Sequence, residues 1–199
     1  MNYLVIDTAT DRSSLALFNN NELIYSGFHD GATEHAEALP KLLKECLSVE
    51  SQVDQVVVGM GPGPYTGLRV GIIFAMSFAN ARQIPWIGVC SLDGIDIDCD
   101  SYLVATDARL KEIYWARYQE GIRTHGPSVC APSEIEDQDV KKFGFGFGDP
   151  LYPSMALLLA KSKRQDVKQP FYLRRPDAIE SSATKYSLFF GIPASSSLN

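Results

Sequence analysis

Apolar and polar positions follow two periods along the first half of the chain. Short apolar runs bounded by turn residues are typical of buried strands, and apolar residues spaced three and four apart are typical of helices with one buried face. Pro40 lies inside the first helical pattern and predicts a kink or a later helix start. The pattern predicts βββαβαβ, with strands at 3–7, 14–18, 23–26, 55–59 and 86–90 and helices at 34–48 and 66–82.

The second half has a similar but weaker pattern. Asp107 ends an apolar run much as Asp7 does in the first half, and Ser133 with Glu136 three residues later fits the start of a short helix. Strands are predicted at 102–106, 112–118, 122–129 and 143–147, and a helix at 152–163. We therefore expect an α/β protein with two mixed sheets flanked by helices, divided into domains 1–98 and 99–199, with a loose tail from Gly191.

A glycine- and proline-rich loop joins the strand at 55–59 to the next helix. It lacks the lysine of a Walker A loop, and no register gives the spacing of a dinucleotide-binding fingerprint. Pro62 and Pro64 have no N–H to offer a phosphate, so the loop is suited to shape more than to anion binding. Thr66 is a candidate N-cap. We interpret as a structural loop Gly61, Pro62, Gly63, Tyr65 and Thr66.

The helix after this loop has almost no polar face. A helix that is apolar nearly all round must be buried nearly all round. Small residues recur every four positions at Gly67, Gly71, Ala75 and Ala79, and this ridge would let another helix approach closely. The ridge either packs inside its own domain or is shared with a partner subunit, and the regular spacing favours the partner.

Composition and charge narrow the class of protein. The chain has 199 residues, is 45% hydrophobic and has a net charge of −6, which disfavours binding of nucleic acid by this chain alone. Residues 151–199 nevertheless carry 7 Lys/Arg against 3 Asp/Glu. This excess indicates either a solvated face or a minor contact with an acidic partner or RNA. The four cysteines form no CxxC pair, and no apolar run is long enough to span a membrane. The first residues resemble a strand and not a signal peptide. We therefore expect a cytoplasmic protein without a secretory signal.

Several motifs together resemble the TsaB (YeaZ) family, and they cover most of the chain. The resemblance rests on the segments 6–10 (IDTAT), 34–37 (EHAE), 61–71 (GPGPYTGLRVG), 106–109 (TDAR) leading to Tyr114, and 172–178 (YLRRPDA). The loop is the most specific of them. The family usually has Ser-Phe where this chain has Pro64-Tyr65.

The resemblance implies two RNase H-like subdomains of the actin-like ATPase superfamily. It further implies a subunit that pairs with the catalytic protein TsaD or with a second copy of itself. The ATPase TsaE would then join this pair. The reaction is threonylcarbamoylation of the tRNA adenosine next to the anticodon, with tRNA reached only through the complex. The first two helices would form the partner interface, which includes Leu39, Leu42, Leu43, Cys46, Gly67, Arg69, Gly71, Ile72, Ala75, Phe78 and Ala79.

The same comparison argues against an enzyme. Phosphate-binding hairpins of this superfamily usually read Asp-x-Gly-x-Thr, but the turns at 7–10 and 107–110 keep the aspartate and lack the glycine. The His-x-x-x-His metal pair of TsaD is absent, because His29 and His35 are six residues apart. The aspartates at 93–100 lack the glycine of a calcium loop and are interpreted as an acidic linker. We expect no cofactor and no metal.

Two other functions stay open at this point. One is an autonomous ATP-binding enzyme of the actin-like class, which the glycine-poor turns disfavour. The other is a glycoprotease-like peptidase, which the missing histidine pair and the absence of a Gly-x-Ser-x-Gly nucleophile motif disfavour.

Overall fold

A computed structural model of the chain describes residues 1–136 and 140–174. The first part follows the predicted order of elements. Its strands and helices are β1 (Asn2–Asp7), β2 (Arg12–Asn19), β3 (Glu22–Asp30), α1 (His35–Val49), β4 (Gln55–Gly59), α2 (Tyr65–Arg82) and β5 (Trp86–Val89). Helix α1 starts at His35 and runs through Pro40, so the predicted later start is wrong.

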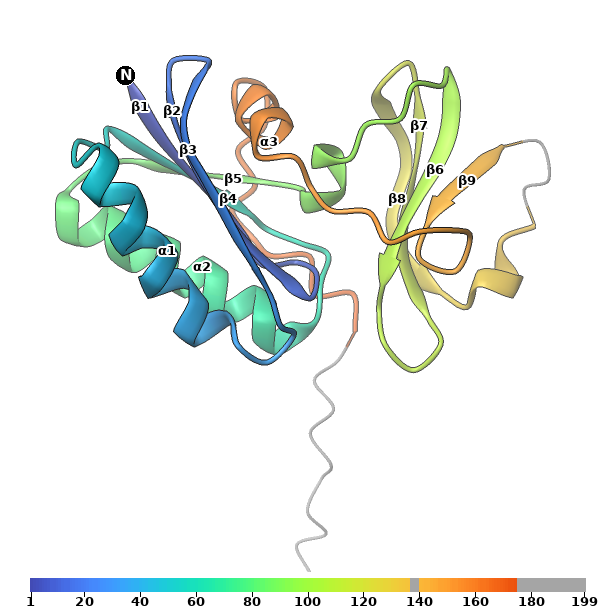
Figure 1. Ribbon diagram of the computed structural model, residues 1–199. Coiled ribbons are helices and arrows are strands. Elements are labelled where there is room, and N and C mark those ends of the chain that lie inside the picture. Colours follow the sequence, from blue (N-terminus) through green and yellow to red (C-terminus); the bar gives the residue numbers. More distant parts are fainter. Residues whose placement is uncertain (137–139, 175–199) are drawn as a thin grey trace, which may run out of the picture.

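The first sheet has the strand order β3-β2-β1-β4-β5. Strand β2 pairs antiparallel with both β1 and β3, whereas β4 pairs parallel with both β1 and β5. Two helices, α1 and α2, cover one face of this sheet (Figure 1). Alternate residues of β1, such as Leu4 and Val5, therefore enter two different cores.

A short 3₁₀ helix, η1 (Ser91–Gly94), leads toward the second sheet. The elements that follow are β6 (Ser101–Asp107), β7 (Ile113–Gln119), β8 (Ile122–Cys130), η2 (Pro132–Glu134), β9 (Lys141–Gly144) and α3 (Met155–Ser162). The strand order β8-β7-β6-β9, with β9 parallel to β6, repeats the first four strands of the first sheet. The predicted fold class is confirmed.

The second half departs from the first in its helices. Among the described residues between β8 and β9 there is only the single turn η2 at the position that α1 occupies in the first half, so the helix predicted from Ser133 is wrong. Helix α3 is shorter than predicted, and it packs Met155, Leu158 and Leu159 on the open face of the first sheet (Figure 1). The division into domains 1–98 and 99–199 stays a prediction, and the tail from Gly191 lies outside the described residues.

Asp93, which the sequence placed in a solvated acidic linker, is buried between the two sheets. Its carboxylate accepts hydrogen bonds from the Tyr118 hydroxyl at 2.7 Å and from Gln165 Nε2 at 2.6 Å, and it pairs with Arg123 Nε at 3.2 Å. Tyr118 and Arg123 come from the second sheet, whereas Gln165 follows α3. The linker interpretation is therefore wrong for Asp93, which joins three separate segments.

No helix among the described residues is both long and apolar enough to cross a bilayer.

Replacing Asp93 with asparagine should destabilise the protein by about 2–4 kcal/mol, because the half-buried Arg123 loses its counter-charge. Chemical denaturation of the two proteins measures the difference. Asp100→Asn, at an exposed position of the same segment, is the matched control and should change the free energy of unfolding by less than about 0.5 kcal/mol. Equal effects of the two substitutions would contradict this role of Asp93.

Candidate functional site

The predicted interface residues of α1 divide between the core and the surface. Leu39, Leu42 and Cys46 are buried against the first sheet, whereas Leu43 is half-buried at the surface. Burial also raises the pKa of the Cys46 thiol to about 11, so this sulfur is inert at neutral pH. Of the α1 residues predicted to contact a partner, only Leu43 is open to one.

The small-residue ridge of α2 also lies inside the subunit. Gly67, Gly71, Ala75 and Ala79 are all buried, and so is Ile72. The prediction that this ridge faces a partner is wrong, because the chain's own residues cover it.

Polar residues from two other segments cover the two glycines of the ridge, whereas Ala75 and Ala79 lie in the apolar core. The Thr8 hydroxyl donates a hydrogen bond to the Gly67 carbonyl at 2.8 Å, and a Cβ at Gly67 would lie 2.8 Å from His35 Nε2. A Cβ at Gly71 would collide with Thr8 Oγ1. Glycine is therefore required at both positions for α2 to approach the β1–β2 turn.

The opposite side of α2 is open and presents both apolar and polar residues, the polar ones including Ser77 and Asn80. Ile73 is 55% exposed and Met76 is 38% exposed, whereas Arg69 is exposed and Phe78 is half-buried. The two helices also carry half-buried apolar residues that pack against the first core, namely Leu43, Leu47, Val70 and Phe74. We call the exposed stripe of Arg69, Ile73 and Met76 with these half-buried neighbours the α1–α2 face. Its central residues, Ile73 and Met76, were absent from the predicted set, although both lie opposite the glycine ridge.

The glycine–proline loop holds the start of α2 against the end of β1. Gly61 has φ +85°, a conformation that favours glycine, and Gly63 lies so close to Ala9 that a side chain would collide with its backbone. Ser91 Oγ accepts a hydrogen bond from the Gly61 N–H at 3.0 Å. Thr66 is not the N-cap, because Pro64 occupies that position and no side chain caps the helix.

Asp7, the first superfamily aspartate, is buried in this framework. Its carboxylate accepts hydrogen bonds from Ser91 Oγ at 2.6 Å and from the Ala9 N–H at 2.9 Å. Burial raises the pKa of Asp7 from its ordinary value of 3.8 to about 6, although both hydrogen bonds oppose the rise. Asp7 therefore serves the loop and does not line the cleft between the sheets.

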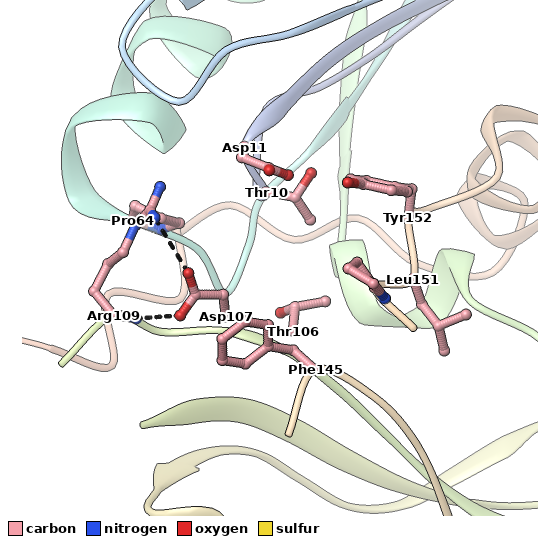
Figure 2. A pocket seen from close by; sticks show the side chains of 10 residues that line it. Thr10, Asp11, Pro64, Thr106, Asp107, Arg109, Phe145, Leu151 and Tyr152 are labelled. Atoms are coloured by element: carbon pink, nitrogen blue, oxygen red, sulfur yellow. Dashed lines mark hydrogen bonds and ion pairs between the residues drawn. The ribbon is translucent and has the colours of Figure 1, made fainter. Parts of the chain in front are cut away.

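A small pocket lies between the ends of the two sheets (Figure 2). It measures about 90 Å³, whereas ligand pockets usually measure about 300–1,000 Å³. Leu151 and Tyr152 line one side of it, and Phe145 lies opposite them beside Asp107. On the other, Asp107 pairs with Arg109 Nη1 at 3.2 Å and accepts the Arg109 N–H at 2.7 Å, so this aspartate is already bound. In this conformation the cleft has room for a few water-sized groups and not for a nucleotide.

The histidines have structural contacts. His35 Nδ1 is hydrogen-bonded to Ser13 Oγ at 2.8 Å, and burial lowers its pKa. His29 pairs with Glu34 at 2.6 Å, and His125 stacks on Trp115 with ring centroids 5.3 Å apart. Within residues 1–136 and 140–174, no three His, Cys, Asp or Glu side chains gather as metal ligands would.

The basic C-terminal residues are spread over several separate contacts. Lys161 donates to the Gly121 carbonyl, Lys163 to Asn21, and Lys168 pairs with Asp166. Arg164 is exposed, and Arg174 donates to the Ala108 carbonyl. The other two, Arg175 and Lys185, lie outside the described residues.

Comparison with known proteins agrees with this architecture. The family model described as "TsaD: tRNA N6-adenosine threonylcarbamoyltransferase" matches residues 29–172. The uncharacterised protein Rv3421c of Mycobacterium tuberculosis is 39% identical, over 88% of this chain and 92% of its own length. The tRNA threonylcarbamoyladenosine biosynthesis protein TsaB of Escherichia coli is 33% identical, over 60% of this chain and 55% of its own length. The chain likewise spans 59% of the length of its Mycobacterium leprae relative ML0378.

A solved structure is similar over nearly its whole length. The crystal structure of an uncharacterised protein from Pseudomonas aeruginosa, described as similar to the peptidase YEAZ, superposes with a TM-score of 0.73 at 25% identity. It covers 87% of this chain and 99% of the other. Together with the repeated strand order, this likeness defines an RNase H-like protein of the actin-like ATPase superfamily. Within that class, the chain belongs to the TsaB (YeaZ) family.

Replacing Gly71 with alanine should lower the free energy of unfolding of the isolated chain by about 1–3 kcal/mol, because the new Cβ collides with Thr8. Thermal or urea denaturation of the chain alone measures it. Ser77→Ala, on the exposed side of the same helix, should stay within about 0.5 kcal/mol of wild type. A Gly71→Ala chain as stable as wild type would contradict this packing.

Asp7 should make stability depend on pH. Because its pKa is higher in the folded state than in the unfolded state, its contribution is complete below pH 3.8 and is lost as the pH rises through about 6. Relative to Asp7→Asn, wild type should therefore lose about 2 kcal/mol between pH 4.5 and pH 7.5. Urea denaturation at both pH values measures the difference. Asp98→Asn, at an exposed position, should follow wild type at both; a difference from Asp7→Asn that does not change with pH would contradict the assignment.

Proposed function

We propose that this chain is a non-catalytic subunit of a tRNA-modifying complex. Through its α1–α2 face it binds a TsaD-like catalytic subunit, and the pair recruits a TsaE-like ATPase. The complex transfers threonylcarbamoyl to the tRNA adenosine next to the anticodon. Membership of the TsaB family supports the pathway, because the E. coli relative carries the name of a tRNA threonylcarbamoyladenosine biosynthesis protein.

One observation supports the binding role more than any other. The large apolar side chains of Ile73 and Met76 are exposed on the outer side of α2. Each could bury further apolar area against a partner, at about 25 cal/mol per Å². Together with the half-buried apolar residues of the α1–α2 face, they could form the centre of a protein interface, where apolar side chains are usual. The same face is free in the absence of the catalytic subunit, so it also supports a homodimer of the chain alone.

The geometry of the cleft supports the non-catalytic role. A nucleotide does not fit in about 90 Å³, and the two superfamily aspartates are already bound, Asp7 in the loop and Asp107 by Arg109. Catalysis would then belong to the TsaD-like subunit. The alternatives of an autonomous ATP-binding enzyme and of a glycoprotease-like peptidase have no observation in their favour among the described residues.

Ile73→Glu should weaken binding of the TsaD-like subunit at least about thirtyfold, which is about 2 kcal/mol, because a charge would enter an apolar contact. Titration calorimetry measures the affinity. The matched control is Ile122→Glu, because Ile122 is 69% exposed at the start of β8 and should leave affinity unchanged. Both variants should fold normally, since each side chain lies at the surface.

The same proteins test the role of the chain in the reaction. With the TsaD-like and TsaE-like subunits present, tRNA modification should require the wild-type chain and should fall with Ile73→Glu but not with Ile122→Glu. Modification that proceeds equally well without the chain would contradict the proposal, as would tight nucleotide binding by the isolated chain.

A further inference from the structure

The start of α2 lies at a corner built from three segments that are distant in sequence. The first is the opening of α2 with Tyr65 and Arg69, the second is the chain at 171–174 after α3, and the third is the β6–β7 turn at 108–112. We call the exposed residues of these segments, together with the half-buried Tyr65, the α2 corner. The exposed ones are Arg69, Arg109, Leu110, Lys111 and Tyr172.

Aromatic and cationic side chains stack at this corner. The rings of Tyr65 and Tyr172 lie 5.0 Å apart at 53°, and the Arg69 guanidinium lies 5.2 Å from the centroid of the Tyr65 ring. Tyr172 is 43% exposed, although the chain just before it is fixed by a hydrogen bond from the Phe171 N–H to the Met60 carbonyl at 2.9 Å. Tyr172 is therefore presented at the surface by a hydrogen-bonded backbone, and the half-buried Tyr65 lies beside its ring.

Arg174 attaches the β6–β7 turn to the same corner. Its Nη1 donates to the Ala108 carbonyl at 2.7 Å, and its Nε pairs with Glu112 at 3.2 Å. Figure 2 shows Arg109, at the beginning of this turn, beside Pro64, the N-cap of α2. The second sheet thus places its β6–β7 turn beside the start of α2.

The backbone of this turn is strained and its tip is exposed. Arg109, Leu110 and Lys111 have φ values of 65°, 51° and 67°, which cost about 1–2 kcal/mol per non-glycine residue. Leu110 is 72% exposed despite being apolar. Backbone strain of this kind tends to persist at binding sites, where the surrounding structure holds it.

The corner carries unpaired positive charge in a chain whose net charge is −6. Arg109 pairs with Asp107, and Arg174 pairs with Glu112. Arg69 and Lys111, in contrast, have no carboxylate partner within residues 1–136 and 140–174. The complementary ligand is therefore anionic.

Continuity with the α1–α2 face favours a protein over a nucleic acid. Arg69 and Ile73 are four residues apart on one side of α2, so a subunit that covers Ile73 reaches Arg69 as well. Tyrosine and arginine are also the residue types enriched in protein interfaces. We infer that the α2 corner binds an acidic patch of the same catalytic subunit that covers the α1–α2 face, and so sets the orientation of the second sheet toward it. This inference rests on the proposed function.

The experiment measures binding of the TsaD-like subunit by titration calorimetry at about 50 mM and about 300 mM salt. Arg69→Glu and Lys111→Glu should each weaken binding about tenfold at low salt, and less at high salt, because surface charges are screened. Tyr172→Ala should weaken binding at both salt concentrations. Lys141→Glu, at an exposed position on β9, is the matched charge control and should leave the affinity unchanged.

The outcomes separate this inference from the function on which it rests. If Ile73→Glu abolishes binding while Arg69→Glu, Lys111→Glu and Tyr172→Ala bind like wild type, the corner has no role and the inference is overturned, whereas the proposed function stands. Unchanged subunit affinity with weaker tRNA binding by the assembled complex would instead assign the corner to RNA and would also overturn it. If the wild-type chain does not bind the subunit, both fail.

Discussion

The close approach of α2 to the turn after β1 is the constraint on which the rest of the structure depends. Two glycines one helical turn apart, Gly67 and Gly71, let the helix touch Thr8 and His35 without intervening side chains. This contact fixes the rotation of α2 about its own axis. Because the small residues must face inward, the larger apolar residues Ile73 and Met76 must face solvent. An apolar exposed stripe is thus a consequence of how the helix packs.

The loop before α2 has a related role. In a phosphate-binding loop the backbone N–H groups would point at a ligand. Here the Gly61 N–H is bound to Ser91, whose hydroxyl donates to the buried Asp7. The aspartate is retained at the end of β1, but it stabilises the loop from inside. The hydrogen bonds from Gly61 to Ser91 and from Ser91 to Asp7 therefore support the start of α2.

Much of the fold could be predicted from the sequence because the local periods are clear. Strands with apolar runs and the helix with a regular apolar stripe, α1, appeared near their predicted positions. The direction of the α2 ridge could not be predicted. A spacing of four indicates that one side of the helix is lined with small residues, but it does not indicate what packs against them. Here the contact with Gly67 comes from Thr8, about sixty residues earlier in the chain. The role of Asp93 was hidden for the same reason, since its partners Tyr118, Arg123 and Gln165 are all remote in sequence.

The central claim is that the exposed stripe of α2 contacts the TsaD-like subunit, and methyl NMR of the full chain during titration with that subunit tests it most directly. The Ile73 and Met76 methyl groups report on the stripe, and the Ile122 methyl group, on the second sheet, serves as the internal reference. The account predicts that the signals of Ile73 and Met76 shift or broaden at substoichiometric subunit while that of Ile122 does not. Saturable binding that leaves both α2 methyl signals unchanged would contradict it.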